Sequence, residues 1–239
     1  MAVKVLQHKS EFRDARRELQ RRGISCMTNS LITRVVHRLK LPRIITIGHI
    51  SKSWDILTTV EFIQGHLPVT APILDIGAFT SEIICVLHRL KYIALTGIDL
   101  DPNIVRMPYA DKIRYETGNF MCTNFADETF SAITATSVIE HGFQSGALLK
   151  EITRLLRPGG YFIASFDYWP NKIDTSNMDM FGMEWRIFSS EEVLALLDAA
   201  KGYGLFPCGP VKLEATEAVV ELAGKSYTFA WLVLQKQQK

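Results

Sequence analysis

The sequence lacks the long apolar runs of membrane proteins, and it holds few cysteines. No stretch approaches the ~20 apolar residues of a membrane-spanning helix, and the opening residues, MAVKVLQHKSEF, contain no apolar leader segment. The four cysteines, Cys26, Cys85, Cys122 and Cys208, form no C-x-x-C pair, which favours reduced, buried thiols over a disulfide framework or a zinc site. We therefore expect a soluble, cytoplasmic protein with no bound metal and no membrane partner.

Glycine is missing where a dinucleotide-binding loop needs it. Residues 73–82 read ILDIGAFTSE, but a G-x-G-x-x-G pattern that starts at Gly77 would place two more glycines at Phe79 and Glu82. Phe79 would crowd a pyrophosphate at the following helix N-terminus, and the Glu82 carboxylate would repel it. The pattern argues against NAD. It suits a cofactor without phosphate and with a positive centre, which Asp75 would attract.

Acidic residues are scarce in the first 48 positions, which hold eleven Lys and Arg against three Asp and Glu, although the net charge of the whole chain is only +2. Phe12, Ala15 and Leu19 have the spacing of the inward side of a helix. We interpret five arginines as the solvated side of that helix: Arg13, Arg16, Arg17, Arg21 and Arg22. A polyanion such as RNA is the alternative interpretation of the same charge.

The length and composition predict one globular domain, since 239 residues with 47% hydrophobic content can bury a large core. Capping residues and apolar periodicity predict helices from Ser10 to Gly23, from Ser30 onward and from Ser53 to Gly65. We expect residues 1–52 to form a basic helical extension and residues 53–239 to form one structural unit.

Short apolar runs then alternate with helices, as in β-α-β units. Strands are expected at 73–76, 92–98, 113–116, 131–139 and 161–166. A helix capped by Ser189 and an apolar run at 226–235 end the chain without an obvious helical crossover. The predicted fold class is α/β: a doubly wound, mostly parallel, seven-stranded Rossmann-like sheet with a C-terminal antiparallel hairpin and an N-terminal helical extension.

The order of several motifs resembles that of the class I S-adenosylmethionine-dependent methyltransferases, of the bacterial small-molecule type, from about Trp54 to the C-terminus. Asp75 and Gly77 match the first motif, and GIDLDP (97–102) places Asp99 at the end of the second strand, 24 residues after Asp75. SVIEH (137–141) and LLRPGGYF (155–162) are similar to the later motifs. The chain departs from the family pattern at Phe79 and Ser81 in the glycine loop, at Asn119, where an acid is usual, and at Ser131.

The resemblance implies S-adenosylmethionine as the cofactor. Asp99 would accept hydrogen bonds from the ribose hydroxyls, and Asn119 would accept one from the adenine amino group through its amide oxygen. The residues implied in cofactor binding are Asp75, Gly77, Ala78, Phe79, Asp99, Leu100, Asn119, Phe120 and Ser137.

A methyl transferase needs little chemistry from its side chains beyond alignment and a base for a hydroxyl acceptor. His141 is the leading candidate for the base, followed by Glu140 and Asp167, because all three follow the fourth and fifth strands; His141 could equally position a loop or a substrate. The segment 167–185 is expected to be an acceptor lid, with Tyr168, Trp169 and Trp185 as substrate-binding residues. Aromatic rings beside acids suit a polar small molecule such as a sugar.

Two alternatives remain open at this point. An RNA-directed O-methyltransferase would use the basic N-terminus, and a catalytically silent binding or scaffold protein would explain the eroded glycine loop. An exocyclic-amine DNA methyltransferase is disfavoured because residues 139–142 read IEHG rather than an Asn/Asp-Pro-Pro-aromatic turn. Cys208 falls too late in the chain for the nucleophile of a cytosine-carbon methyltransferase.

Overall fold

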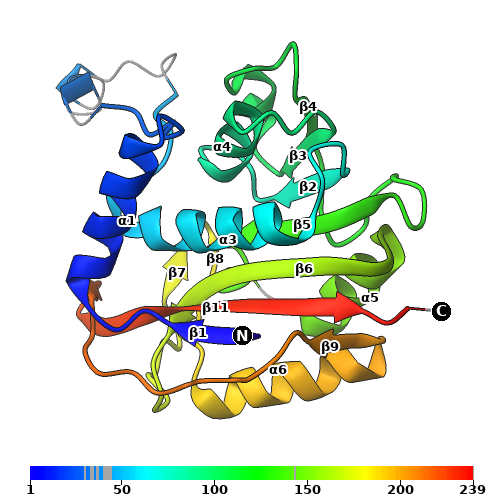
Figure 1. The fold of residues 1–239 in the computed structure, drawn as a ribbon. Coiled ribbons are helices and arrows are strands. Elements are labelled where there is room, and N and C mark those ends of the chain that lie inside the picture. The colour runs from blue at the N-terminus through cyan, green and yellow to red at the C-terminus, as the bar shows by residue number, and fades with distance from the viewer. Residues whose placement is uncertain (30, 33–34, 36–37, 40–44, 143, 239) are drawn as a thin grey trace.

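A single large sheet organises the chain (Figure 1). The computed structural model describes residues 1–29, 31–32, 35, 38–39, 45–142 and 144–238. Nine of the described strands join in the sheet, whose main path runs β1-β11-β6-β5-β2-β3-β4. Its strands are β1 (Val3–Val5), β2 (Ile73–Ile76), β3 (Leu95–Asp99), β4 (Arg114–Thr117), β5 (Phe130–Thr136), β6 (Leu156–Tyr168), β9 (Leu205–Pro207), β10 (Val220–Leu222) and β11 (Lys225–Lys236).

The centre of the sheet is parallel, as the β-α-β pattern predicts. β2 pairs in parallel with β3 on one side and with β5 on the other, and β3–β4 and β5–β6 are also parallel. All four residues of β2 are buried, which explains its continuous apolar run. The carboxyl ends of these strands therefore meet at one edge, where open α/β sheets bind ligands.

The antiparallel part of the sheet is larger than the sequence suggests. β10 and β11 form the predicted C-terminal antiparallel hairpin, and β11 also pairs antiparallel with β6 and β9. The sheet has nine strands rather than the predicted seven. β1 joins it by pairing with β11 through Val3–Val5, and the short strand β10 is easily overlooked in the sequence. The first residues of the expected helical extension thus belong to the sheet.

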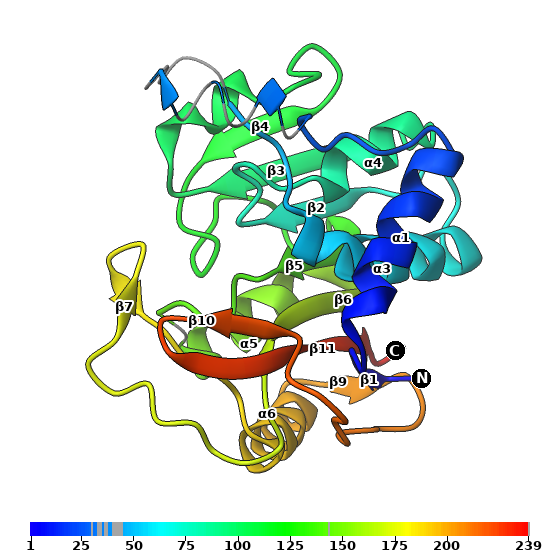
Figure 2. The same ribbon diagram turned by 90° about the vertical axis from the view of Figure 1, so that its left-hand side faces the viewer.

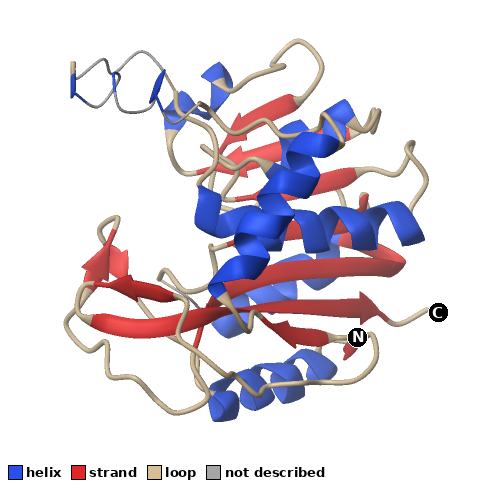
Figure 3. Ribbon diagram, turned by 60° about the vertical axis from the view of Figure 1, so that its left-hand side comes forward, coloured by secondary structure: helices blue, strands red, loops and turns tan. Residues whose placement is uncertain are grey.

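Helices cover both faces of the sheet (Figures 1 and 3). On one face, residues of α3 (Ser53–His66) and α4 (Ile83–Arg89) share a hydrophobic core with β2 and β3, and α1 (Lys9–Arg21) lies against α3. On the other face, α5 (Ser145–Leu155) and α6 (Ser190–Gly202) pack against β5, β6 and β11. This is the doubly wound arrangement that the sequence predicts.

The helix ends show which local signals were informative. Ser189 and Glu192 form the predicted capping box of α6. α1 begins at Lys9 rather than being capped by Ser10, because the Glu11 carboxylate accepts hydrogen bonds from the backbone N–H groups of Gln7 and His8. The helix predicted from Ser30 lies largely outside the described residues.

Two further expectations need correction. The fifth strand was expected at 161–166, but β6 begins at Leu156 and includes the Pro-Gly-Gly stretch, where the pairing with β5 shifts register. All four cysteines are free, but the thiol side chain of Cys122 is exposed rather than buried. Within the described part of the chain, no helix has both the length and the apolarity to cross a membrane.

Candidate cofactor and acceptor site

Asp75 lies one residue before the end of β2, inside the protein rather than at its surface. Its carboxylate is 1% exposed, and Oδ1 accepts a hydrogen bond of 2.7 Å from the Thr134 hydroxyl on the neighbouring strand β5. Oδ2 has no hydrogen-bond partner among the described residues. Burial raises the pKa of Asp75 to about 7. Asp75 therefore offers one unused acceptor atom at the carboxyl edge of the sheet.

Asp99 ends β3 close to the loop that follows β2. Because Asp75 is paired with Gly97, Asp99 lies two residues farther toward the carboxyl edge. Its Oδ2 accepts the backbone N–H of Phe79 at 3.0 Å, and its Oδ1 accepts that of Asp101 at 2.9 Å. Each carboxylate oxygen can accept a second hydrogen bond, so the half-buried Asp99 retains acceptors for a pair of hydroxyls. Both carboxylates therefore keep acceptor atoms, and their roles in binding S-adenosylmethionine remain predictions.

The glycine loop is closely packed. Gly77 has a φ of +67°, and a Cβ atom there would lie 2.4 Å from Cγ2 of Val138, so no other residue fits without movement. Ala78 is fully buried, and the Phe79 ring packs against the hydrophobic core on the α3 and α4 side. Phe79 thus makes a core contact with its ring and fixes Asp99 with its backbone.

The remaining residues assigned to the cofactor lie nearer to solvent. Leu100 is 52% exposed, and Phe120 is half-buried against the core on the α5 and α6 side. Asn119 is exposed, and its Oδ1 accepts the backbone N–H of Met121 at 2.9 Å. The second lone pair of that oxygen is still available to a donor. The adenine role of Asn119 remains a prediction.

The exit of β5 carries a group of buried polar atoms. Ser137 has a φ of +54°, and its backbone N–H donates to the carbonyl of Ser165 on β6. Among the described residues, no hydrogen-bond partner is found for Ser137 Oγ, Ser165 Oγ, Glu140 Oε2 or His141 Nδ1. Burial raises the pKa of Glu140 well above its ordinary value, and the neighbouring Asp167 adds to the shift. Burial also lowers the pKa of His141, so its imidazole stays neutral at pH 7.

The Asp167 carboxylate interacts with two neighbouring side chains. Its Oδ2 accepts a hydrogen bond of 2.8 Å from Trp185 Nε1, and its Oδ1 lies 3.9 Å from Lys52 Nζ. The Lys52 ammonium also lies 3.6 Å from the centroid of the Phe229 ring. Asp167 therefore joins β6, the segment before α3 and the predicted lid.

The predicted lid contains a short hairpin that projects from the body of the protein (Figure 2). Its strands are β7 (Asp179–Met180) and β8 (Met183–Glu184), and Phe181 at the tip is 86% exposed. The Phe181 ring meets the His141 ring edge to face, with centroids 5.3 Å apart. Backbone hydrogen bonds from Gly142 to Glu184 and from Arg186 to Glu140 tie the hairpin to the exit of β5.

Of the three residues expected to bind substrate, Tyr168 is placed in the core. It is fully buried, and its hydroxyl is hydrogen-bonded to Ser190 and to the carbonyl of Leu213. Its ring belongs to the core on the α5 and α6 side, and its role in substrate binding stays a prediction. Trp185 is also fully buried, and Trp169 is half-buried beside it in a third apolar cluster.

Sequence reasoning missed Asp55 and Lys52. Asp55 is fully buried in the first turn of α3, neither of its oxygens has a partner among the described residues, and burial raises its pKa to about 7. An acid in the first turn of a helix is common, so the sequence gave no reason to separate Asp55 from an ordinary helix start. Only the packing of α3 over β6 shows that this carboxylate faces the site.

Glu82, which stands where a dinucleotide-binding loop has its third glycine, has a structural role. Glu82 is 2% exposed, and its two oxygens accept hydrogen bonds of 2.8 and 2.6 Å from the guanidinium of Arg16. Glu82 Oε1 also accepts the backbone N–H groups of Cys26 and Met27. Arg16 was expected on the solvated side of its helix, but it is 4% exposed and also donates to Ser53.

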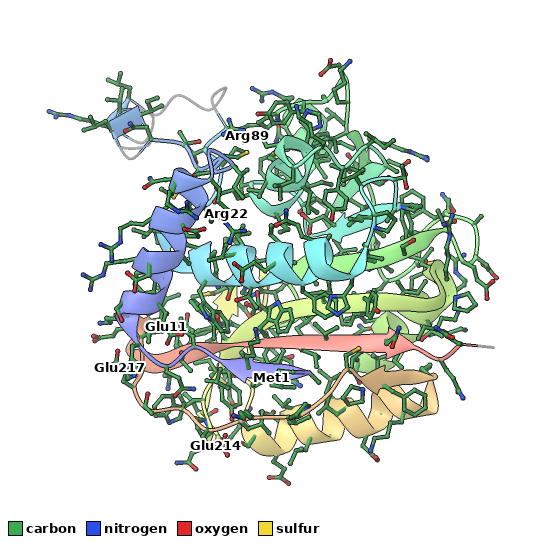
Figure 4. All side chains as sticks on the ribbon, in the orientation of Figure 1. Met1, Glu11, Arg22, Arg89, Glu214 and Glu217 are labelled. Atoms are coloured by element: carbon green, nitrogen blue, oxygen red, sulfur yellow. The ribbon has the colours of Figure 1, made fainter. Side chains whose placement is uncertain are left out.

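Two further arginines, Arg22 and Arg89, hold the same region together (both labelled in Figure 4). Arg22, which ends α1, donates to Glu18 and to Glu61 on α3. Arg89 of α4 donates to the carbonyl of Ser25. Part of the basic charge of the N-terminal region is therefore used within the protein.

Two surface hollows open away from the carboxyl edge. Their volumes are about 420 and 540 Å³, and both are lined by Met1, Lys4 and Thr58. Neither is lined by a residue that the sequence assigns to the cofactor or the acceptor. At the carboxyl edge, Val138 packs closely against Gly77, and Trp185 is fully buried.

Comparison with known proteins identifies the class. Residues 74–164 match a family profile described as a methyltransferase domain. A search of curated proteins found no relative of the sequence. Among solved structures, an S-adenosylmethionine-dependent methyltransferase from Methanosarcina mazei is 17% identical, with a TM-score of 0.54 over 74% of this chain and 98% of that one.

Two other solved structures show the same fold. Geranyl diphosphate C-methyltransferase from Streptomyces coelicolor A3(2), with magnesium, geranyl diphosphate and S-adenosylhomocysteine bound, is 16% identical, with a TM-score of 0.56 over 75% of this chain and 78% of that one. The 1,6-didemethyltoxoflavin-N1-methyltransferase of Burkholderia thailandensis is 18% identical, with a TM-score of 0.55 over 77% and 78%.

The matched domain, the parallel sheet and the acids at its carboxyl edge together define the class. Residues 74–164 match a methyltransferase domain, and the fold around them is the one found in S-adenosylmethionine-dependent methyltransferases. The resemblance drawn from its motifs and the predicted fold class are confirmed.

Proposed function

We propose that the protein transfers a methyl group from S-adenosylmethionine to a hydroxyl, or another nucleophile, of a polar small molecule such as a sugar. Solved structures of the same fold include proteins with small-molecule substrates, which supports this acceptor class. The main support is the position of Asp75 and Asp99 at the carboxyl ends of two neighbouring parallel strands. Both carboxylates can still accept further hydrogen bonds.

The expected cofactor contacts are inferred from the polar atoms at the carboxyl edge of the sheet. Asp99 would hold the ribose hydroxyls, and Asp75 Oδ2 and Ser137 Oγ would face the amino-acid part, since both of these atoms are buried and unpartnered in the described structure. Asn119, Leu100 and Phe120 would surround the adenine. The bound sulfonium supplies an activated methyl group with a good leaving group.

His141 is the proposed base. Its pKa is lowered by burial, so the ring is neutral and able to accept a proton at pH 7. The Phe181 ring of the hairpin β7–β8 contacts it edge to face and would shield one side of the imidazole from water. Glu140 and Asp167 flank this position. Because burial and the neighbouring Asp167 raise the pKa of Glu140 well above its ordinary value, and Asp167 already accepts the Trp185 N–H, both suit positioning better than proton abstraction.

Calorimetric titration with S-adenosylmethionine and S-adenosylhomocysteine tests the proposal. We expect binding of both, followed by release of S-adenosylhomocysteine when sugars and other polar small molecules are screened as acceptors. Absence of heat and of any thermal shift at millimolar ligand would support the scaffold alternative. Salt-dependent RNA binding together with methylation of RNA would support the RNA alternative.

A further inference from the structure

Three buried acids meet under the first turn of α3. Asp55, Glu140 and Asp167, here termed the buried acidic cluster, are 0%, 1% and 4% exposed. Asp167 and Ser165 lie on the same face of β6, opposite Phe229 and Trp231 of β11, and Trp231 Nε1 donates to Thr59 of α3. This contact places α3, and with it Asp55, over the carboxyl end of β6.

The cluster offers more hydrogen-bond acceptors than its surroundings can use. Within the described residues, no hydrogen bond of standard geometry reaches either Asp55 oxygen or Glu140 Oε2; the Ser165 hydroxyl lies near Asp55 and the Ser137 hydroxyl near Glu140, and each opposes the effect of burial on the pKa of that acid. A buried polar atom without a partner is costly, so native proteins keep such atoms mainly where a ligand supplies the missing donors. These polar atoms come from three separate elements and converge on one place.

The cluster brings three carboxyl groups together around one ammonium group. Lys52 is the cation that interacts with Asp55, Glu140 and Asp167, and its ammonium is shared with the Phe229 ring. The other titratable groups that face the cluster are His141, whose pKa is lowered, and Tyr227, whose pKa is raised by burial and by Asp167. No set of His, Cys, Asp or Glu side chains in the described ranges is arranged to hold a metal ion. A second cation at this place would favour the ionised forms of Asp55 and Glu140, which burial disfavours.

We propose that the buried acidic cluster binds a protonated amino group of the methyl acceptor. An ammonium carries three N–H donors and one charge, which match acceptors spread over Asp55, Glu140 and Ser165. Trp185 covers the cluster from the lid side through its bond to Asp167, so the acceptor enters when the segment 169–187 moves aside. This inference rests on the proposed function and narrows its acceptor to an amine-bearing polar molecule.

Matched pairs of amines and alcohols test this inference. Thermal shifts of the full chain would be measured with S-adenosylhomocysteine present, using glucosamine against glucose, tyramine against 4-(2-hydroxyethyl)phenol, and putrescine against 1,4-butanediol. We expect at least one amine at millimolar concentration to stabilise the protein and its alcohol counterpart to have no effect. Equal shifts within every pair, or no shift with any amine, would overturn the inference.

Variants show where the amine binds. Asp55→Asn and Glu140→Gln should each weaken amine binding by about tenfold or more, because each removes a charge-assisted hydrogen bond. Asp198→Asn, at a site 82% exposed on α6, should leave amine binding unchanged. Calorimetry at pH 7 in two buffers of different ionisation enthalpy should show proton release on amine binding that is reduced in Asp55→Asn. Binding without that difference would count against contact with Asp55.

The cofactor also carries an ammonium group, so its binding is measured separately. We expect Asp55→Asn to leave the affinity for S-adenosylhomocysteine unchanged. A parallel loss of that affinity would show that the cluster serves the cofactor, and the inference would be wrong. If the wild-type protein bound no S-adenosylhomocysteine, the proposed function would fail, and amine shifts measured without it would still decide whether the cluster binds amines.

Discussion

The carboxylate of Asp99 accepts a hydrogen bond from the backbone N–H of Phe79 at 3.0 Å. The acid that ends β3 therefore also fixes the loop that follows β2, the loop in which a bulky residue replaces a glycine. In this arrangement Phe79 contributes its backbone to the site and its ring to the core, and the missing glycine does not remove the acceptor atoms that a cofactor needs.

Loss of the Asp99 side chain should weaken cofactor binding. We expect Asp99→Ala to reduce the affinity for S-adenosylhomocysteine by ~1–3 kcal/mol, because hydroxyl donors lose a charged acceptor and the Phe79 N–H loses its partner. Titration calorimetry measures this change. Asp111→Ala, at a site 75% exposed, serves as the control, and equal affinities of the two variants would contradict the role of Asp99.

Gly77 should tolerate no side chain while Val138 is present. Gly77→Ala adds an atom 2.4 Å from Val138 Cγ2 and forces alanine to a φ of +67°, so we expect a loss of roughly 2 kcal/mol or more in the free energy of unfolding. In a Val138→Ala background the same change should cost less, because only the backbone strain remains. Urea unfolding of the wild type, the two single variants and the double variant gives the coupling free energy between the two positions. Additive effects would show that the contact is unimportant.

Much of this fold could be predicted because its signals are local. The continuous apolar run at β2, the acids at the carboxyl ends of β2 and β3, and the capping box of α6 each act within a few residues. Their order along the chain then fixes a parallel sheet, since each helical crossover returns the next strand in the same direction.

The rest depends on contacts between residues far apart in sequence. β1 becomes a strand only because Val3–Val5 pair with β11, more than 220 residues away. Arg16 has the helical position of a surface residue, and it is buried because Glu82 lies opposite. Tyr168 follows the lid-proximal Asp167, but the alternation of side chains along β6 turns its ring to the other face. Neither the apolar periodicity of a segment nor a short motif predicts such contacts.

The Arg16–Glu82 pair should be required for stability. Removing one partner of a buried ion pair leaves the other charge uncompensated, so Glu82→Gln should lower the free energy of unfolding by about 3–5 kcal/mol. Glu18→Gln, which removes a surface partner of Arg21 and Arg22, should have a much smaller effect. Chemical unfolding compares the two variants. Similar midpoints would show that Glu82 does not anchor the N-terminal segment.

The rate of methyl transfer should report the protonation of His141. Because burial lowers its pKa, activity should be constant near pH 7 and fall only below the ordinary histidine range, as the imidazole becomes charged. His141→Gln should remove this acidic limb and lower kcat while leaving S-adenosylhomocysteine affinity unchanged. Persistence of the limb in His141→Gln would transfer the role to another group or make His141 a positioning residue.

Asp55 should make stability depend on pH with a definite sign. Its folded pKa of about 7 exceeds that of an unfolded aspartate, which is near 4, so the folded state holds the extra proton between these values. Wild-type stability should therefore fall relative to Asp55→Asn as pH rises from about 4 to about 7, and the difference should level off above pH 7. At one pKa unit per 1.36 kcal/mol, the full difference is at most ~4 kcal/mol.

Urea unfolding of both proteins across this pH range measures that difference. Asp75 and Glu140 have pKa shifts of the same sign, but they are present in both proteins, so their effects cancel in the comparison. Asp198→Asn controls for the general effect of removing a carboxylate from the chain, because it lies on the surface of α6. A stability difference between wild type and Asp55→Asn that did not change with pH would mean that Asp55 is ionised throughout. Its carboxylate would then already have a partner in the folded protein, and the buried acidic cluster would have no need of a cation from outside.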